Sequence, residues 1–478
     1  MAFIDGTVVN VALPALQNYF HASGTDLQWV VESYALFLAA LLLVGGSLGD
    51  LYGRRKCFLA GVVLFAAASA CCGLAPTIRT LIIFRGVQGI GAALLVPGSL
   101  ALISASFPTQ TRGQAIGTWS GFTSITAAIG PLLGGWLVQH ASWRWIFFLN
   151  LPLALAVLLI CAWRVPEPPI SEAGKGLDWS GATLATVGLG ALTFALIESS
   201  RGGRYLLPIG IGGALLLFAF LFVESRSPKA MMPLDLFRSR NFSGANLMTL
   251  FLYAPLSGAL YYLPLNFIQV QHYSPTAAGA ALLPFILLMF LLSRWSGSLV
   301  ARYGARIPLV VGPIIVAAGF ALFLLPAVGG SYWYTFFPAI LTLGFGMAVS
   351  VAPLTTVVMS SVAQENAGTA SGVNNAVSRV AGLLALALFG ILFNQLFARN
   401  LKVNLEHSTI AEGRKEQLWS ERDKLAAIPT NDSREEESVE TGFVYAFRGT
   451  MLFAAGLSVL AAMAAGGLIE AQAPEQPK

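Results

Sequence analysis

Two long apolar runs meet at Gly46-Ser47-Leu48-Gly49-Asp50-Leu51-Tyr52-Gly53-Arg54-Arg55-Lys56. The runs cover residues 28–49 and 57–74, and each is long enough to cross a bilayer as a helix. The glycines allow close approach and a tight turn, while the acid and the basic residues can latch neighbouring helices together. Short loops rich in Lys and Arg stay on the cytoplasmic side. The stretch therefore predicts a cytoplasmic hairpin whose conformational latch consists of Gly46, Asp50, Gly53, Arg54 and Arg55.

A related stretch occurs in the second part of the chain. Residues repeated from the first copy are Gly297-Ser298-Leu299, Tyr303-Gly304 and Arg306, with Ala301 where the first copy has Asp50. Further along, Gly344 and Gly346 repeat the spacing of Gly89 and Gly91. Internal repeats of this kind are how many secondary transporters are built. The sequence therefore predicts two related halves.

The hairpin resembles a signature of the major facilitator superfamily, G-x-L-a-D-r-x-G-r-k, which lies between the second and third helices of that family. Leu51 departs from the basic residue that is usual at its position. The resemblance implies an all-α membrane fold of two six-helix bundles that carries small molecules by alternating access.

The composition independently indicates a membrane protein. Of the 478 residues, 56% are hydrophobic and 11% are charged, whereas soluble domains carry about 25% charged residues. The net charge of +5 comes from Lys and Arg scattered through short loops, so no nucleic-acid partner is expected. The four cysteines all lie in apolar runs and are expected to be small buried hydrophobes: Cys57, Cys71, Cys72 and Cys161.

Fourteen apolar runs are counted, and helices follow because backbone groups in hydrocarbon must pair within their own segment. The runs are 1–20, 28–49, 57–74, 79–105, 114–139, 143–163, 178–198, 205–225, 241–268, 276–299, 308–328, 333–361, 369–396 and 443–468. The runs 178–198 and 205–225 separate two sets of six runs. This arrangement resembles the fourteen-span drug:proton antiporter branch of the superfamily. The predicted parts are a bundle over 1–163, two inserted helices with their loops over 164–240, and a second bundle over 241–478. The first run starts at Met1, which suggests a short first helix or a truncated start.

The distribution of basic residues predicts the orientation. With the hairpin inside, thirteen Lys and Arg fall on the cytoplasmic side and four on the other side. Both termini are then cytoplasmic, in the inner or plasma membrane. The polar segment 397–442 falls outside, where we expect a solvated loop with a short surface helix over 412–425.

Five charged side chains fall within the apolar runs, where each costs about 2.5 to 3.5 kcal/mol on insertion scales. They are Asp5, Glu32, Arg85, Glu198 and Arg379. Asp5 begins a motif that is similar to one in the first span of the fourteen-span family, an acid followed by T-x-x-N-x-A-L-P. That resemblance implies a proton-coupling role. The alternative is a hydrogen bond to a neighbouring helix.

Arg85 lies in Arg85-Gly86-Val87-Gln88-Gly89-Ile90-Gly91-Ala92, which resembles the fourth-span motif R-x-x-q-G-x-g-a of the family. A guanidinium beside a titrating carboxylate stabilises its charged form. Arg85 is therefore predicted to modulate proton coupling at Asp5, or else to make a fixed link to backbone carbonyls.

The antiporter motif G-P-x-x-G-G of the fifth span is matched by Gly130, Pro131, Gly134 and Gly135. Proline removes a backbone donor and glycine permits close contact, so a hinge or a seal against leak is expected there. The second half lacks this motif.

Polar residues on the spans are candidates for the substrate cavity: Asn10, Glu32, Gln88, Glu198, Asn374, Asn375 and Arg379. Glu32 is the best placed to meet a cationic substrate. Interfacial positions for Glu32 and Glu198 remain alternatives, and so does helix packing for Arg379.

The sequence predicts that this protein is not an enzyme. His21, His140, His272 and His407 have no spacing that makes a catalytic or metal site, and no Gly-rich phosphate loop precedes a helix. We therefore expect no cofactor and no metal. The predicted function is proton-coupled efflux of amphiphilic, cationic or lipophilic small molecules by a functional monomer whose partners are substrate, protons and the lipid bilayer. Export of an endogenous metabolite or lipid-like compound, or a receptor or scaffold role, remains an alternative.

Overall fold

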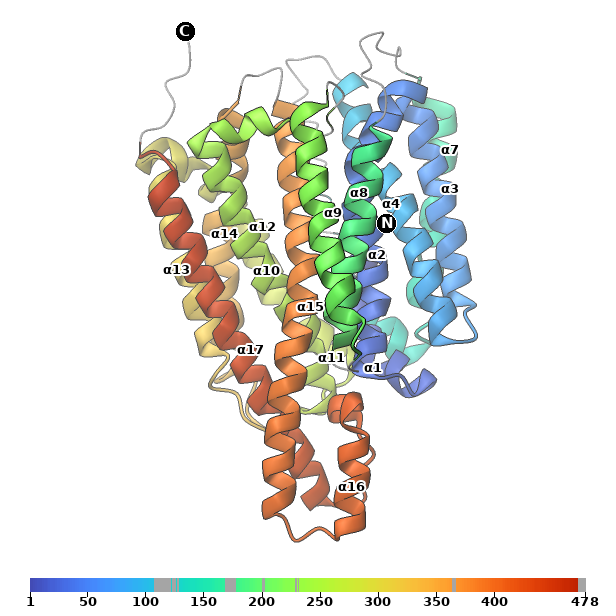
Figure 1. Ribbon diagram of the computed structural model, residues 1–478, viewed down its shortest axis with the longest axis vertical. Coiled ribbons are helices and arrows are strands. Elements are labelled where there is room, and N and C mark those ends of the chain that lie inside the picture. Colours follow the sequence, from blue (N-terminus) through green and yellow to red (C-terminus); the bar gives the residue numbers. More distant parts are fainter. Residues whose placement is uncertain are drawn as a thin grey trace.

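The computed structural model describes residues 1–106, 122, 126, 129–167, 178–199, 203–227, 230, 232–362 and 367–471. Within these residues every regular element is a helix (Figure 1). In the first part of the chain these are α1 (Ala2–Phe20), α2 (Gly24–Tyr52), α3 (Arg54–Gly73), α4 (Ile78–Ser106), a helical segment 129–140, α6 (Trp145–Phe148), α7 (Asn150–Arg164), α8 (Trp179–Glu198) and α9 (Leu206–Arg226). The second part holds η2 (Leu234–Arg238), α10 (Arg240–Gln269), α11 (Pro275–Ala281), α12 (Leu283–Tyr303), α13 (Arg306–Leu322), α14 (Phe336–Ser360), α15 (Ala367–His407), α16 (Glu412–Ser420), η4 (Arg422–Ala427) and α17 (Ser433–Leu468).

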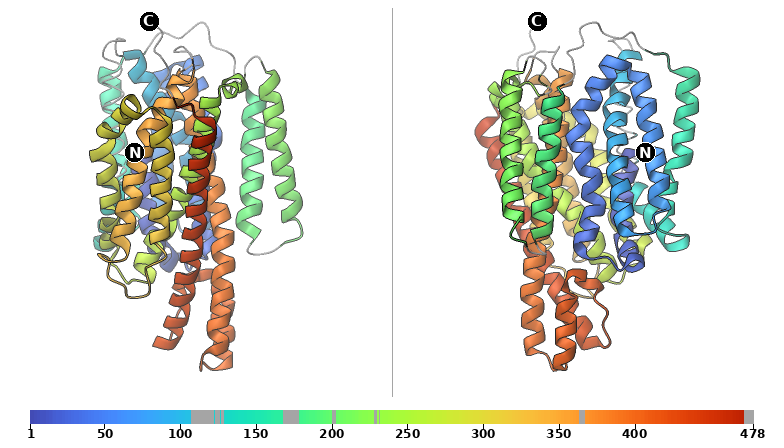
Figure 2. Two further views of the ribbon diagram at one scale, coloured as in Figure 1. Left: turned by 90° about the vertical axis from the view of Figure 1, so that its left-hand side faces the viewer. Right: turned by 45° about the vertical axis from the view of Figure 1, so that its right-hand side comes forward.

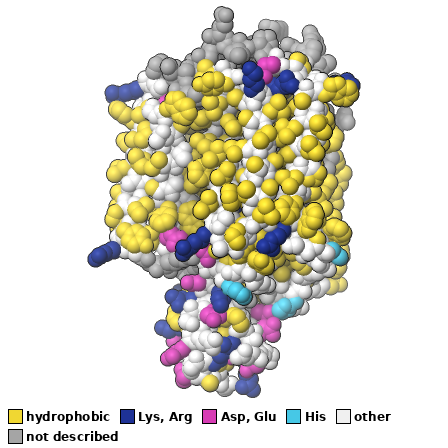
Figure 3. Space-filling view, turned by 90° about the vertical axis from the view of Figure 1, so that its right-hand side faces the viewer, with side chains coloured by type: hydrophobic (Ala, Val, Ile, Leu, Met, Phe, Trp, Pro, Cys, Tyr) yellow, Lys and Arg dark blue, Asp and Glu magenta, His cyan; other side chains and the backbone are white. Residues whose placement is uncertain are grey.

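The helices form an upright body with an apolar girdle. Ten helices of the described part are long and apolar enough to cross a membrane. In the space-filling view hydrophobic side chains cover this body, and charged side chains gather at its two ends (Figure 3). This distribution is the one expected of a protein surrounded by lipid.

The two predicted halves contain matching helix crossings. Gly53 directly follows α2 and Gly304 directly follows α12, with positive φ values of 103° and 74° that glycine adopts without strain. Gly91 of α4 packs on Phe65 of α3, and a Cβ there would lie 2.6 Å from the Phe65 nitrogen. Gly346 of α14 meets Val316 of α13 at the same 2.6 Å. Glycine at each crossing lets two backbones touch, so the two halves share one packing scheme.

The pair α8 and α9 stands on the flank of the body, as Figure 2 shows. α8 packs on α9, on α2 of the first half and on α15 of the second half. Leu36 and Ala40 of α2, Leu189 of α8 and Leu383 of α15 form one buried cluster. The inserted pair therefore lies against the line where the halves meet.

The segment 397–442 was expected to be a loop and is mostly helix. α15 continues without a break to His407, α17 already begins at Ser433, and α16 lies between them. This projecting part, called the module below, extends past the apolar body at the bottom of Figure 1. The expectation is wrong because a polar segment can also form a helix in water. Ion pairs one helical turn apart, as between Lys415 and Glu412, support a helix in water.

The module also contacts the first half. Gln17 of α1 donates its Nε2 to the carbonyl oxygen of Lys424 at 2.9 Å. Leu425, buried and at a left-handed φ of 56°, packs beside Gly24 at the start of α2. The second half thus reaches over the end of the first half on the module side.

Candidate functional site

A buried charge network lies inside the first half. Asp5 of α1 is fully buried and forms an ion pair with Arg85 of α4 through Oδ2. Its other oxygen, Oδ1, accepts from Gln88 Nε2 at 2.9 Å and from Asn150 Nδ2 at 3.0 Å. Four helices, α1, α3, α4 and α7, meet here, since Asn150 also donates to Ser69 of α3 at 3.0 Å. The carboxylate is held entirely by protein donors.

Arg85 is held as tightly as its partner. Besides Asp5, it donates from Nη1 to Gln88 Oε1 at 2.8 Å and from Nε to the Val30 carbonyl at 3.1 Å. Its guanidinium lies 4.4 Å from the centre of the Tyr34 ring, which adds a cation–π contact. Arg85 therefore pairs with Asp5 and also links to a backbone carbonyl, while its predicted effect on proton coupling stays a prediction.

Local sequence explains this placement. Arg85 and Gln88 are three residues apart on α4, so their side chains leave the same face of the helix and reach one carboxylate. Asn150 and Ser69 complete the network but were not among the predicted residues. The available signal was a polar side chain at the start of or within a long apolar run, the same signal that singled out Asn10 and Gln88.

The arrangement satisfies a buried ion pair. An anion in hydrocarbon needs a counter-charge and donors, and here it has one guanidinium and two amides. The Asp5 carboxylate therefore finds all of these partners within the first half.

The predicted antiporter motif lies between the two halves on the module side. A Cβ at Gly130 would lie 2.0 Å from Thr7 Oγ1, and one at Gly134 would lie 2.3 Å from Val8, so the segment packs directly on α1. Its other face meets α11. A Cβ at Gly135 would lie 2.2 Å from the Pro275 oxygen.

The contact with α11 is reciprocal. A Cβ at Gly279 of α11 would lie 2.1 Å from the oxygen of Pro131. We call this contact of segment 129–140 with α11 the module-side seal. Gln269 of α10 extends it by donating to Gln17 of α1 at 2.7 Å.

Adding a methyl group to the seal is expected to weaken the contact between the halves. Gly279→Ala places a Cβ against backbone that cannot move without separating the halves, so we expect a loss of stability of about 1 to 3 kcal/mol. The matched control is Gly456→Ala on α17, where a Cβ meets nothing within 4 Å. Thermal unfolding of both purified variants checks this. Equal unfolding temperatures for the two variants would show that the contact accommodates the added methyl group.

The latch hairpin lies at the other end of the body. α3 begins at Arg54, and Glu167 accepts from the backbone N–H groups of Arg55 and Lys56 at 3.0 and 3.2 Å. A carboxylate at a helix N-terminus is stabilised by the free N–H groups and the helix dipole. Gly46 and Asp50 lie on the last turns of α2. Glu167 was not predicted, because it follows a span and lies far from the hairpin in sequence.

Two predicted cavity acids have different surroundings. Glu32 on α2 is fully buried, and neither of its carboxylate oxygens has a hydrogen-bond partner in the described part of the chain. Tyr261 on α10 lies within electrostatic range, and its hydroxyl group also lacks a partner there. Glu198 instead accepts from Trp29 Nε1 at 2.8 Å, linking α8 to α2.

The remaining predicted residues lie in different parts of the structure. Gln88 belongs to the Asp5 network. Asn374 of α15 donates to Asn246 and Thr249 of α10 at 3.1 and 2.7 Å, so it joins two helices of the second half. Asn375 bonds its own helix at the Ser371 carbonyl and is exposed.

Arg379 and Asn10 are both half-buried. Arg379 of α15 interacts electrostatically with Tyr34 of the first half and Tyr253 of the second. The side-chain oxygen of Asn10 on α1 has no hydrogen-bond partner among the described atoms.

Two related helical halves, an apolar girdle and a buried charge network fit a membrane transporter, and the family and relatives below are transporters, not enzymes. The chain belongs to the Major Facilitator Superfamily, whose family model matches residues 1–386.

Named relatives extend this assignment. The chain is 36% identical over 422 residues to the multidrug resistance protein Stp of Mycobacterium tuberculosis, covering 85% of this chain and 76% of the relative. It is 35% identical over 400 residues to the tetracenomycin C resistance and export protein of Streptomyces glaucescens, covering 82% and 73%. In fold it is similar to a bacterial homologue of the human lysosomal transporter Spinster, solved in an inward-facing and unoccupied conformation. That match has a TM-score of 0.68 at 18% identity and covers 99% of this chain and 96% of the other.

Proposed function

We propose that this protein exports amphiphilic, mainly cationic or lipophilic small molecules in exchange for protons. The observation that carries the proposal is the fully buried pair of Asp5 and Arg85. A buried charge in a membrane helix is costly, and a carboxylate with a movable counter-charge is suited to carry a proton. The relatives named for drug resistance and antibiotic export support efflux over a metabolite carrier or a receptor.

The proposed transport cycle alternates between a conformation closed on the module side and one open on that side. With the module side closed, Asp5 is ionised and paired with Arg85, and substrate enters from the cytoplasm. Rocking of the halves opens the module-side seal, releases substrate and lets a proton reach Asp5. The return movement brings the proton inside, where Arg85 favours its release. Protein groups move the proton, and no cofactor takes part.

The proposed architecture has fourteen spans. To the ten candidate spans we add α1, α2, α13 and segment 129–140, which gives fourteen. The subfamily would then be the fourteen-span drug:proton antiporters, with bundles over 1–163 and 241–478 and an inserted pair within 164–240. One buried hydrophobic cluster runs through both halves of the chain, and we propose that a monomer suffices for alternating access.

The module is expected on the outer face and both termini in the cytoplasm. In a background without the four native cysteines, Glu412→Cys in the module should react with an impermeant maleimide on intact cells. Asp235→Cys in η2 is equally exposed at the other end and should react only after lysis. Labelling of both in intact cells would overturn the orientation and the inner-membrane topology.

The hairpin is proposed to act on the conformational equilibrium. Asp50→Asn should lower turnover several-fold while leaving substrate affinity nearly unchanged, because α2 ends there at the face opposite the module. Binding by fluorescence anisotropy and efflux by liposome assay separate these effects. The comparison variant is Asp235→Asn, an exposed acid on the same face. Normal turnover of Asp50→Asn would leave the hairpin as a topology signal alone.

Glu32 is proposed to recognise the positive charge of substrate. Its carboxyl group is buried, lacks hydrogen-bond partners among described residues and faces the second half near Tyr261. Asn10, Glu198, Asn374, Asn375 and Arg379 are proposed as further cavity residues. Glu32→Gln should weaken binding of ethidium more than binding of a neutral dye, and equal weakening would remove this role.

The proposed function is tested with purified protein in liposomes. Ethidium should move against its gradient when a pH gradient is imposed, and protons should move in the opposite direction. Collapse of the pH gradient should stop the uphill movement. Uphill transport that survives the collapse of the pH gradient would reject proton coupling.

A further inference from the structure

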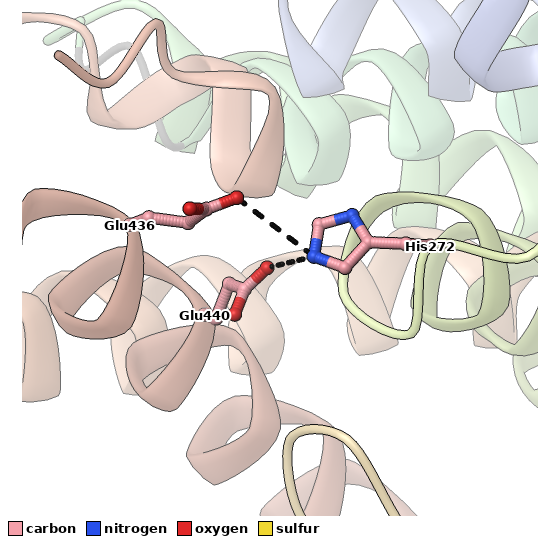
Figure 4. Close-up of side chains that lie close together, drawn as sticks. All are labelled: His272, Glu436 and Glu440. Carbon is pink, nitrogen blue, oxygen red and sulfur yellow. Dashed lines mark ion pairs between the residues drawn. The ribbon is translucent and has the colours of Figure 1, made fainter. Parts of the chain in front are cut away.

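A second group of functional side chains lies far from Asp5, at the base of the module. His272 lies in the turn between α10 and α11, while Glu436 and Glu440 lie on α17 (Figure 4). His272 Nε2 is 2.9 Å from Glu440 Oε1 and 3.8 Å from Glu436 Oε1. One nitrogen and two carboxylate oxygens therefore face a common point and lie within 4.8 Å of one another.

The surrounding backbone holds these side chains in place. Glu436 and Glu440 are one helical turn apart, so they leave the same face of α17. The turn of His272 is fixed on one side by Gln271, which donates to the Ala327 carbonyl at 3.0 Å. On the other side the Tyr273 N–H donates to the Phe267 carbonyl at 2.8 Å. His272 itself has a left-handed φ of 54°.

The contact between His272 and Glu440 joins an exposed imidazole to a buried carboxylate. The side chain of Glu440 is 8% exposed, and His272 Nε2 lies 2.9 Å from its Oε1. Glu436, one turn earlier on α17, adds a second carboxylate on the solvent side of this pair. Two carboxylates this close to each other repel unless a positive charge lies beside both.

We propose that His272, Glu436 and Glu440 bind one divalent transition-metal ion. Imidazole nitrogen and carboxylate oxygen are both ligands of Zn²⁺, and nitrogen and oxygen ligands about 2.0 to 2.2 Å from one ion lie about 3 to 3.5 Å apart. The observed separations of 2.9 and 3.8 Å bracket that range. Water completes the coordination on the exposed side, where His272 and Glu436 are open to solvent.

Such an ion would join two parts of the second half. It ties the turn before α11 to α17, and α11 carries the Gly279 contact of the module-side seal. Metal bound only by the folded protein raises its stability by mass action. The site is independent of the proton-coupling proposal, because none of its residues belongs to the Asp5 network.

The test is a titration of Zn²⁺ into full-length protein purified in detergent without a histidine tag. Isothermal calorimetry should show one site, and thermal unfolding should move to higher temperature with Zn²⁺. Glu436→Gln, at an exposed position, and His272→Ala should each weaken Zn²⁺ binding by about tenfold or more and abolish the thermal shift. The matched control is His407→Ala, an exposed histidine of α15 that lies outside this cluster.

Each outcome decides the proposal. Loss of binding in both site variants with retention in His407→Ala supports it. Equal binding by all four proteins would mean an adventitious ion only, and no binding by the parent protein would mean a plain ion pair between His272 and the two glutamates. Either result overturns the metal site.

Discussion

Asp5→Asn is expected to abolish uphill efflux driven by a pH gradient while leaving downhill exchange of substrate. A neutral amide neither takes up nor releases a proton, yet it keeps the size of the side chain and can still accept from Gln88 and Asn150. Alternating access itself requires only the rocking of the two halves. Liposomes loaded with ethidium, with and without a pH gradient, separate the two activities.

Two variants serve as comparisons for Asp5→Asn. Glu470→Gln changes an exposed acid after α17 and should transport like the parent protein. Glu32→Gln should keep coupling but require more ethidium to saturate. Full uphill efflux by Asp5→Asn would contradict the assignment and move proton coupling to Glu32, Glu198 or another group.

Arg85→Gln is expected to cause the largest loss of stability. It leaves the buried Asp5 carboxylate without its counter-charge, and breaking one side of a buried ion pair costs about 3 to 5 kcal/mol. It also removes the donor to the Val30 carbonyl and the contact with Tyr34. Thermal unfolding in detergent measures the effect, with Arg238→Gln at an exposed site as the control.

The double variant Asp5→Asn with Arg85→Gln distinguishes charge from packing. With no unpaired charge left, it should recover most of the lost stability, so the two changes should be strongly non-additive. If the double variant is as unstable as the sum of the single variants, the destabilisation comes from lost packing and the ion pair contributes little.

The sequence predicted the repeat and the principal charge pair for physical reasons. Glycine at a helix crossing is required by close backbone contact, so Gly91 and Gly346 are visible as a recurring pattern. Charges in hydrocarbon are costly, so Asp5 and Arg85 stand out in apolar runs and need partners. That these two meet each other was suggested by the family resemblance.

Other features were not visible in the sequence. Asn150 contacts residues that lie 81 and 145 positions away in the sequence. Glu167 contacts residues that lie 111 and 112 positions away. No local spacing in the sequence indicates such contacts. The sequence also gives no sign that His272 approaches α17, because Glu436 and Glu440 lie more than 160 positions further along the chain. The module was missed for another reason. Its many charged residues suggest a loop, whereas its apolar residues, such as Leu401 and Leu405, recur at helical spacing and are buried.

The unbroken course of α15 from the apolar body into the module has a mechanical consequence. Its 41 residues make a rod about 60 Å long, roughly twice the thickness of the hydrocarbon core. A tilt of about 10° at its inner end displaces the far end of such a rod by about 10 Å. The tip of the module therefore moves farther than the membrane-embedded part when the second half rotates. Distance labels placed at this tip would show the largest changes.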